Sequence, residues 1–374
     1  MEESSSSLSI EDDYAYLLTL LPEGWREKAK ELGALRRCRK VLDAERLLRV
    51  LLIHLAEGCS LRETALRARQ GGIAELSDVA IMDRLRGSER WFWWMNQQLM
   101  SRWVRRGPEL VFPARWNARL IDGTRIKEPG PTGSSWLIHY SIRLPSLSCD
   151  ALLVSEPKGG EGESFRNFAV QPGDLFIGDR AYGVRPSLSR VVSQGGNVLT
   201  RFALSNLPLQ RDDGGRFDLL KRLRRLKPCE IGEWSAQTRD DGDGAVCGRV
   251  VAVAKTRQAA ERAQQRARRQ AQKSGDGEVR PETLEAAKYV FVFSTARRED
   301  LSAGQALEMY RGRWQIELVF KRLKSILDLG HLRKTDPESA KAWLQGKLLA
   351  AFLIEALIRC GESFFPWGWP LDEP

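Results

Sequence analysis

The strongest constraint on the fold is a series of short apolar runs between residues 117 and 202. Five runs are too short for helices and have the composition of strands: 118–121, 136–142, 151–154, 175–177 and 197–202. Within 136–142 the apolar residues alternate, which predicts a half-buried strand. Helical spacing is confined to 163–170 and 184–193. The order predicts an α/β fold of the α+β kind, with helices packed on a mixed sheet.

The regions on either side of this sheet have a different texture, which suggests a division into domains. We expect residues 1–12 to form a flexible tail and residues 13–112 an all-helical N-terminal domain that binds DNA. Residues 204–287 are rich in turns and are predicted to be an inserted subdomain. The core domain then comprises 113–203 and 288–362, and the Pro- and Trp-rich residues 363–374 form an irregular tail.

Regular structure is also expected inside and after the insertion. Strands are predicted around Trp234 and over 246–253, and a polar helix over 255–273 carries seven Lys or Arg residues and one acid. This helix fits either a surface that follows a DNA backbone or an ordinary solvated helix. The sheet resumes at 289–293, and two helices follow, over 303–327 and 340–359.

Composition narrows the class of protein. The chain has 374 residues, is 42% hydrophobic and carries a formal net charge of +10, so a globular protein with a polyanionic partner is expected. No apolar run approaches the roughly 18–20 residues that span a bilayer, and the N-terminus lacks a signal peptide. Six scattered cysteines indicate reduced thiols and no zinc site. We therefore expect a cytoplasmic protein without a membrane partner.

Two short helices in the N-terminal region have loose helix–turn–helix spacing. The first is predicted to begin at Ser60, ahead of Glu63, and the second covers 77–85, after a turn at Gly71-Gly72. Arg84 and Arg86 could contact DNA, but two packed helices of a bundle explain the pattern equally well. The aromatic residues of 91–94, with Trp103 nearby, are more typical of a core or a domain interface than of base stacking.

Two aspartates follow predicted buried strands. Asp122 comes after Leu120-Ile121, and Asp179 comes after Phe176-Ile177-Gly178. Since functional sites of open α/β sheets form at strand ends, these carboxylates are expected to lie close together, where they would need a cation. Taken alone, each aspartate is better explained as a turn residue.

A third acid lies on a helix with an unusual polar face. At 100° per residue, Tyr310, Arg313, Glu317 and Lys324 fall within about 60° of arc, beside an apolar stripe that faces the core. Such a row could hold one metal-binding carboxylate and several phosphate-binding groups. A solvated face with an Arg313–Glu317 pair is the alternative.

The string Tyr310-x2-Arg313-x3-Glu317-x6-Lys324 matches the Y-x2-R-x3-E-x6-K signature of DDE transposases from bacterial insertion sequences. The segments Asp122-Gly123-Thr124 and 178–183 (Gly-Asp-Arg-Ala-Tyr-Gly) resemble the two aspartate motifs of the same family, and a long insertion precedes the last motif. The resemblance covers about residues 115–335. It implies a ribonuclease-H-like core interrupted by a mostly β insertion.

The resemblance also implies site residues and partners. Asp122, Asp179 and Glu317 would bind two Mg²⁺ or Mn²⁺ ions, and Tyr310, Arg313 and Lys324 would contact phosphates of the transposon end. Arg201 and Arg180 are further candidates for DNA contact. The expected partners are double-stranded DNA, as terminal inverted repeats and as target, and a second protomer on paired ends, with association with the nucleoid. A role in base flipping cannot be assigned, because no Trp occurs between Trp234 and Trp314.

Two other functions share these features in part. A ribonuclease-H-like nuclease without strand transfer would not need the row of Arg313 and Lys324 or the long insertion. A DNA-binding regulator would not need three carboxylates.

Overall fold

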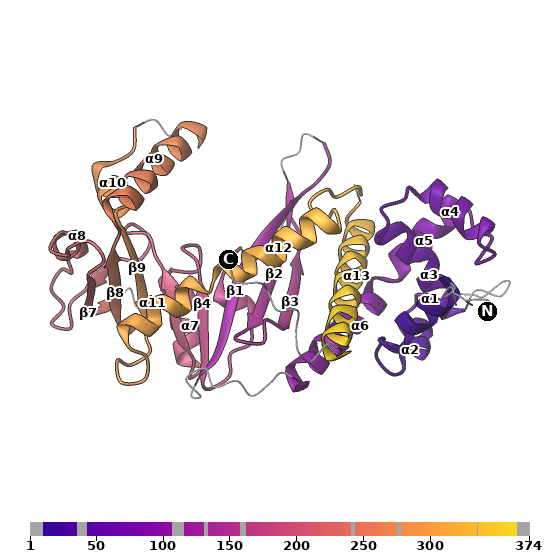
Figure 1. Ribbon diagram of the computed structural model, residues 1–374, viewed down its shortest axis with the longest axis horizontal. Helices are drawn as coiled ribbons and strands as arrows, with labels where there is room; N and C mark the ends of the chain where they lie inside the picture. Colours follow the sequence, from indigo (N-terminus) through magenta and orange to yellow (C-terminus); the bar gives the residue numbers. More distant parts are fainter. Residues whose placement is uncertain are drawn as a thin grey trace, which may run out of the picture.

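A computed structural model of the chain describes residues 10–35, 43–106, 116–130, 134–157, 162–240, 244–274, 278–334 and 336–364. The molecule is elongated, with N-terminal helices at one end, a long sheet through the middle and the insertion at the other end (Figure 1). Most of the predicted tails, residues 1–9 and 365–374, lies outside the described residues, whereas residues 10–12 and 363–364 are helical and not part of a tail.

Six helices form the N-terminal end: α1 (Ile10–Thr19), α2 (Trp25–Glu31), α3 (Ala44–Leu55), α4 (Leu61–Gln70), α5 (Asp78–Gly87) and α6 (Glu89–Arg106). Ser60 and Ser77 cap α4 and α5, as predicted, by accepting backbone N–H groups of the first turn. Arg86 of α5 donates to Ser339 Oγ at 2.9 Å. It therefore ties α5 to the last helix, which favours the packed-bundle interpretation for this arginine.

The aromatic cluster of α6 belongs mainly to the core, as expected. Trp91 and Phe92 are fully buried, and the indole N–H of Trp91 donates to the carbonyl of Trp25 at 2.8 Å. Trp93 is 48% exposed. The side chain of Trp103 lies outside the described part of the chain.

One mixed sheet of nine strands runs through the rest of the molecule, in the order β3-β2-β1-β4-β5-β9-β8-β7-β6. The strands are β1 (Asn117–Lys127), β2 (Ser135–Arg143), β3 (Cys149–Ser155), β4 (Asp174–Gly178), β5 (Asn197–Arg201), β6 (Leu209–Gln210), β7 (Ile231–Thr238), β8 (Cys247–Ala254) and β9 (Tyr289–Ser294). Strands β1, β4 and β5 are parallel, and the other pairs are antiparallel. The predicted mixed sheet with flanking helices is confirmed.

The central strands differ from the prediction in two respects. Strand β1 does not end at Asp122, because its antiparallel pairing with β2 continues to Lys127. Only the parallel pairing with β4 stops earlier, at Leu120 and Ile177. Strand β2 is buried on both faces rather than one, since its polar residues His139 and Ser141 are also fully buried.

Helices after β3 lie on both faces of the sheet or at its edge. They are a single 3-10 turn, η1 (Phe165–Asn167), and the α-helices α7 (Arg185–Ser193), α8 (Leu219–Leu223), α9 (Arg257–Ser274), α10 (Pro281–Ala286), α11 (Ala303–Arg311), α12 (Trp314–Ile326) and α13 (Pro337–Phe364). The helix predicted over 163–170 is thus reduced to η1. Helices α11 and α12 cross the sheet together, and α13 packs against the N-terminal helices (Figure 1).

The long helix predicted over 303–327 is broken at Gly312 and Arg313. At the break the backbone bonds tighten to three-residue spacing: Arg313 N–H donates to Tyr310 and Ile316 N–H donates to Arg313. Glycine has a low helix propensity, which makes position 312 a favourable place for the break. Glu317 and Lys324 therefore share α12, whereas Tyr310 lies on α11.

The insertion extends the sheet. Strand β9 pairs with β5 of the core and with β8 of the insertion, so β6, β7 and β8 continue the same ladder. Helices α8, α9 and α10 account for more of its residues than these strands do. Its apolar residues join a core cluster that also contains Phe176, Val198 and Tyr182 of the central sheet.

A buried ion-pair network fixes the start of β1 and β4. Arg119 interrupts the apolar run of β1, yet its side chain is only 6% exposed. Its guanidinium contacts Asp150 at 2.9 Å and Asp174 at 3.2 Å, and it lies over the ring of Phe176. Both carboxylates are as buried as the arginine, so each buried charge has a partner, as burial requires.

Candidate active site

Asp122 and Asp179 lie side by side because β1 and β4 are parallel neighbours. The parallel pairing ends at Leu120 and Ile177, and each aspartate follows two residues later. The Thr200 hydroxyl, on β5, donates to the carbonyl of Asp179 at 2.8 Å, and the Asp179 carboxylate accepts the N–H of Ala181. The strand register therefore places both aspartates at the same end of these two strands, as predicted.

The Asp122 carboxylate is largely buried, with 14% of its side chain exposed. Burial, together with the neighbouring charges of Asp179 and Glu163, raises the pKa of Asp122 to about 7. The N–H of Gly123 and the guanidinium of Arg313 act in the opposite direction. Like charges therefore outweigh cations around Asp122, as expected where a cation is to bind.

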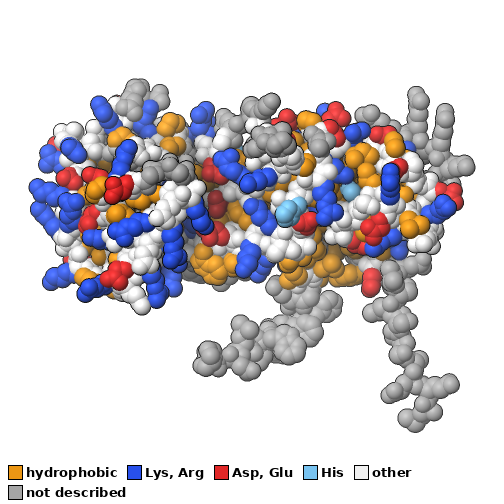
Figure 2. Space-filling view, turned by 90° about the horizontal axis from the view of Figure 1, so that it is seen from above, with side chains coloured by type: hydrophobic (Ala, Val, Ile, Leu, Met, Phe, Trp, Pro, Cys, Tyr) orange, Lys and Arg blue, Asp and Glu red, His pale blue; other side chains and the backbone are white. Residues whose placement is uncertain are grey.

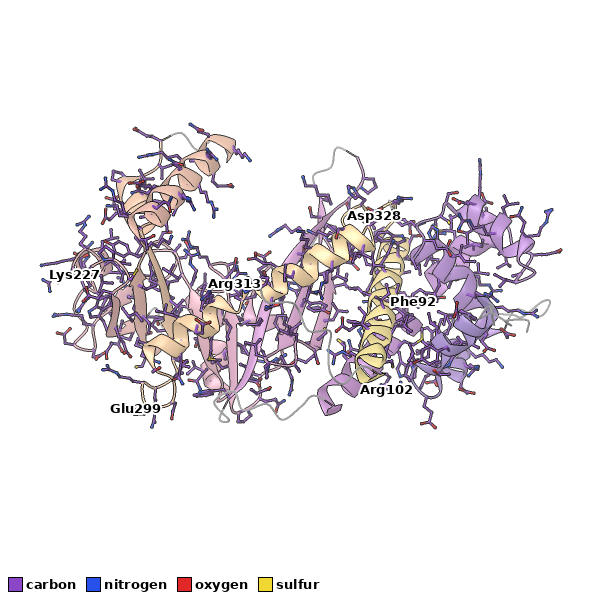
Figure 3. All side chains as sticks on the ribbon, in the orientation of Figure 1. Phe92, Arg102, Lys227, Glu299, Arg313 and Asp328 are labelled. Atoms are coloured by element: carbon purple, nitrogen blue, oxygen red, sulfur yellow. The ribbon has the colours of Figure 1, made fainter. Side chains whose placement is uncertain are left out.

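Arg313 connects Asp122 to Glu317. Its Nη1 atom lies 3.3 Å from Asp122 Oδ2, and its Nη2 atom contacts Glu317 Oε1. Arg313 lies at the junction of α11 and α12, over the middle of the sheet (Figure 3). The break in the helix thus positions an arginine between two carboxylates from distant parts of the chain. Glu317 itself is half exposed and faces the surface.

Tyr310 and Lys324 lie on either side of Arg313 and Glu317, but only Tyr310 is close to the aspartates. Tyr310 is buried, and burial raises its pKa, while the cations Arg313 and Arg201 lower it. Lys324 lies two turns beyond Glu317 on α12 and donates to the carbonyl of Arg125 at 3.4 Å. The structure therefore groups Tyr310 and Arg313 with the aspartates and places Lys324 farther along the same face.

Two residues of this site were not among the sequence candidates. Glu163 precedes η1, and its side chain packs on Gly123, where an added Cβ would lie 3.0 Å from Glu163 Cγ. Tyr182, in the second aspartate motif, is fully buried, and its hydroxyl has no hydrogen-bond partner among the described residues. Glu163 had no local signal, because only tertiary packing brings it to Asp122.

The residues present fit a divalent cation. Hard cations take oxygen ligands, and Asp122, Asp179, Glu163 and Glu317 offer carboxylates from four separate segments. In the described residues the acids do not form a ready-made metal cluster at ligand distances, and Arg313 lies between two of them. The buried, unpaired hydroxyl of Tyr182 and the repulsion acting on Asp122 show polar groups in need of a partner.

A basic cavity adjoins the acids on the insertion side. It has a volume of about 1600 Å³ and lies between β5, α8, α9 and α10. Eight basic residues line it: Arg180, Arg201, Arg216, Arg239, Lys255, Arg262, Arg266 and Arg280, against two acids, Asp218 and Glu282. Burial, with the charges of Arg201 and Arg180, lowers the pKa of Lys255 to about 8. The face in Figure 2 shows Lys and Arg side chains gathered at the insertion end.

Arg180 and Arg201 connect this cavity to the aspartates. Arg180 directly follows Asp179, and burial and the charge of Arg201 lower its pKa. Both arginines were candidates for DNA contact from the sequence, and both line the cavity. An anionic strand in the cavity would therefore lead toward Asp179.

A model of the family described as the transposase DDE domain matches residues 154–353, more than half of the chain. This chain belongs to the DDE transposase family. The match contains Asp179 and Glu317, whereas Asp122 precedes it. Members of the family generally use a divalent metal. Among the described residues of this transposase, no helix is both long and apolar enough to cross a membrane.

Similar proteins agree with this family over nearly the whole chain. The transposase for insertion sequence element IS421 of Escherichia coli is 34% identical over 351 residues, 92% of this chain and 93% of that protein. InsL of insertion sequence element IS186A, from Escherichia coli (strain K12), is 34% identical over 350 residues with the same coverage. A piggyBac transposase in a synaptic complex with hairpin DNA has 9% identity and a TM-score of 0.42, over 95% of this chain and 80% of that chain.

Proposed function

We propose that this transposase cuts DNA at the ends of its element and joins the freed 3′-OH to target DNA, with Asp122, Asp179 and Glu317 as its catalytic carboxylates. The observation that carries this proposal is the meeting of Asp122 with Asp179 at one sheet edge, with Arg313 joining Asp122 to Glu317. These three acids would hold two Mg²⁺ or Mn²⁺ ions. The chemistry that such ions supply when bound is activation of the attacking oxygen and stabilisation of the leaving oxygen.

The protein contributes positioning and charge. Arg313 now satisfies both Asp122 and Glu317, so a cation shared by these carboxylates requires the guanidinium to turn away. A DNA phosphate is a suitable new partner, since guanidinium groups bind phosphate oxygens in a bidentate manner. Tyr310 and Lys324 would contact phosphates on either side of Arg313. Binding of DNA would thereby free the carboxylates at the moment the substrate arrives.

The basic cavity supports a path for DNA along the insertion. Its arginines would neutralise phosphates without reading sequence, which gives salt-dependent affinity. Arg262 and Arg266 of α9 line the cavity, so at least this face of the polar helix would serve DNA rather than solvent alone. Arg180 and Arg201 would guide the strand from there to Asp179.

The wider reaction follows from the same assignment. We expect three domains: an N-terminal DNA-binding domain over 13–112, a catalytic core over 113–203 and 288–362, and an inserted subdomain over 204–287. The N-terminal domain would recognise the terminal inverted repeats. Two protomers would act on paired ends in a cut-and-paste reaction, in the cytoplasm and on the nucleoid. A nuclease without strand transfer is the alternative, and the cationic row of Arg313 and Lys324 favours the transposase.

A cleavage assay tests the catalytic assignment. The purified chain is incubated with labelled DNA that carries the ends of its own element, with Mg²⁺ or Mn²⁺. We expect the wild type to nick the ends and join them to target DNA, and Glu317→Gln to lose activity by about 10³-fold or more while it still binds the DNA. Glu308→Gln, an exposed acid on α11, is the matched control and should stay active. Normal cleavage by Glu317→Gln would overturn the assignment.

A further inference from the structure

The connection between β3 and β4 brings a fourth acid to the site, and packing fixes its position. Phe165, two residues after Glu163, stacks on Tyr182 with a centroid distance of 4.9 Å. The backbone N–H of Phe165 donates to Ser187 Oγ at 2.9 Å. An added Cβ at Gly178 would meet the Phe165 ring at 2.8 Å, so only glycine allows this approach next to Asp179.

Glu163 has no strong partner of its own within the described chain. Its closest cation is Arg125, at 4.0 Å, and that arginine is 65% exposed, so the pair contributes little. The Glu163 side chain is 23% exposed and lies over Gly123, next to Asp122. Glu163 adds a third carboxylate beside Asp122 and Asp179, where Arg313 contacts only Asp122, so its charge destabilises the metal-free protein. Such an arrangement persists where it serves binding.

The Tyr182 hydroxyl gives a second, independent observation. It is fully buried, it has no partner among the described residues, and the charges of Asp122, Glu163 and Asp179 all act on it. A buried polar group is normally satisfied, so this hydroxyl indicates a ligand or an ordered water next to it, within the influence of the three acids.

We propose that Glu163 is a fourth carboxylate of the metal site, and that Asp122, Glu163 and Asp179 surround one divalent cation beneath the Tyr182 hydroxyl. This inference rests on the proposed role of Asp122 and Asp179. Glu163 binds the cation directly or orients its water ligands, as outer-shell carboxylates do. The site therefore holds one ion by three acids before Arg313 releases Glu317.

Titration of the full-length, DNA-free chain with Mn²⁺, followed by calorimetry, tests this role without any activity measurement. We expect Glu163→Gln to weaken Mn²⁺ binding by about tenfold or more. The matched control is Glu156→Gln, an exposed acid just after β3, which should bind Mn²⁺ like the wild type. Asp122→Asn separates the two proposals. If it binds Mn²⁺ like the wild type, the whole metal site is wrong; if it weakens binding and Glu163→Gln does not, only the role of Glu163 is wrong.

The melting temperature in EDTA distinguishes metal binding from a structural role. Removal of the Glu163 charge relieves repulsion from Asp122 and Asp179, so we expect Glu163→Gln to melt at a higher temperature than the wild type without metal. The stabilisation that Mn²⁺ adds should shrink in the same variant. A lower melting temperature in EDTA would show that Glu163 holds Arg125 for the fold, and would overturn the proposal.

Discussion

Charged residues lie at both ends of the parallel pairing between β1 and β4, but the carboxylates are paired with cations at the start and repel one another at the other end. At the start, Arg119 contacts Asp174 and Asp150, and every member of this network is almost fully buried. At the other end, Asp122 lies beside Asp179 and contacts Arg313, and a third acid, Glu163, adds to the repulsion on Asp122.

This difference separates charges that serve the fold from charges that serve binding. In the first network each carboxylate is paired, so nothing more can bind there. In the second, burial and the charges of Asp179 and Glu163 outweigh the charge of Arg313 at Asp122, which destabilises the metal-free protein. Two groups of aspartates a few residues apart on the same strands thus have opposite effects on stability.

The largest expected effect comes from breaking the buried ion-pair network of Arg119, Asp150 and Asp174. Arg119→Ala leaves Asp174 buried without its cation and leaves Asp150 with Arg143 alone, which should lower the free energy of unfolding by about 3–5 kcal/mol. Urea denaturation of the full chain, followed by circular dichroism, measures this loss. Arg257→Ala, which removes an exposed pair on α9, is the control and should change stability by less than about 0.5 kcal/mol. Equal effects of the two variants would contradict the comparison.

The next effect has the opposite sign. Since the pKa of Asp122 is raised to about 7, the folded protein keeps a proton that the unfolded chain releases above about pH 4. Stability in EDTA should therefore fall as pH rises from about 4 to 7 and then level off. Asp122→Asn removes this loss, so at pH 8 it should be more stable than the wild type by an amount on the order of 2 kcal/mol.

Melting temperatures from pH 5 to 8 test this prediction, and the gap between variant and wild type should widen with pH. Asp174→Asn is the matched substitution at the paired end and should destabilise the protein. If Asp122→Asn also destabilises the protein at pH 8, then the charge of Asp122 stabilises the fold as that of Asp174 does, and the comparison fails.

The smallest expected effect comes from Arg313, which contacts Asp122 and Glu317. Arg313→Gln removes the guanidinium that competes for Asp122 and Glu317, so Mn²⁺ should bind the DNA-free chain about two- to fivefold more tightly. Calorimetry measures this change, and Arg311→Gln, an exposed neighbour, is the control. Weaker Mn²⁺ binding by Arg313→Gln would show that this arginine organises the carboxylates instead of competing for them.

Local sequence patterns were sufficient where the deciding interactions are local. Apolar runs predicted the strands, and their ends predicted the proximity of Asp122 and Asp179, because parallel strands place such residues at one edge. Glu317 was predicted from the family signature, because its spacing along a helix fitted a solvated face equally well. All five strands of the core domain that precede the insertion were predicted, and the open question for each was mainly where it ends.

The remaining features depend on contacts between distant segments. In the sequence, Arg119 only interrupts the apolar run of β1. Its partners Asp150 and Asp174 lie on β3 and β4, so the strand order decides the contact. Glu163 joins the site through the packing of Phe165 on Gly178, which has no sequence period. The break at Gly312 was missed because a single glycine is usually tolerated within a helix at a cost of about 1 kcal/mol.

The pairing of β9 with both β5 and β8 has a consequence for how the insertion is held relative to the core. The chain leaves the core after β5 and returns on β9, its direct neighbour, so the insertion can change in length without moving the proposed catalytic acids. Yet the ladder between β8 and β9 leaves no hinge there. The basic cavity beside α9 therefore keeps a fixed separation from Asp179, because strand pairing joins the insertion to the core.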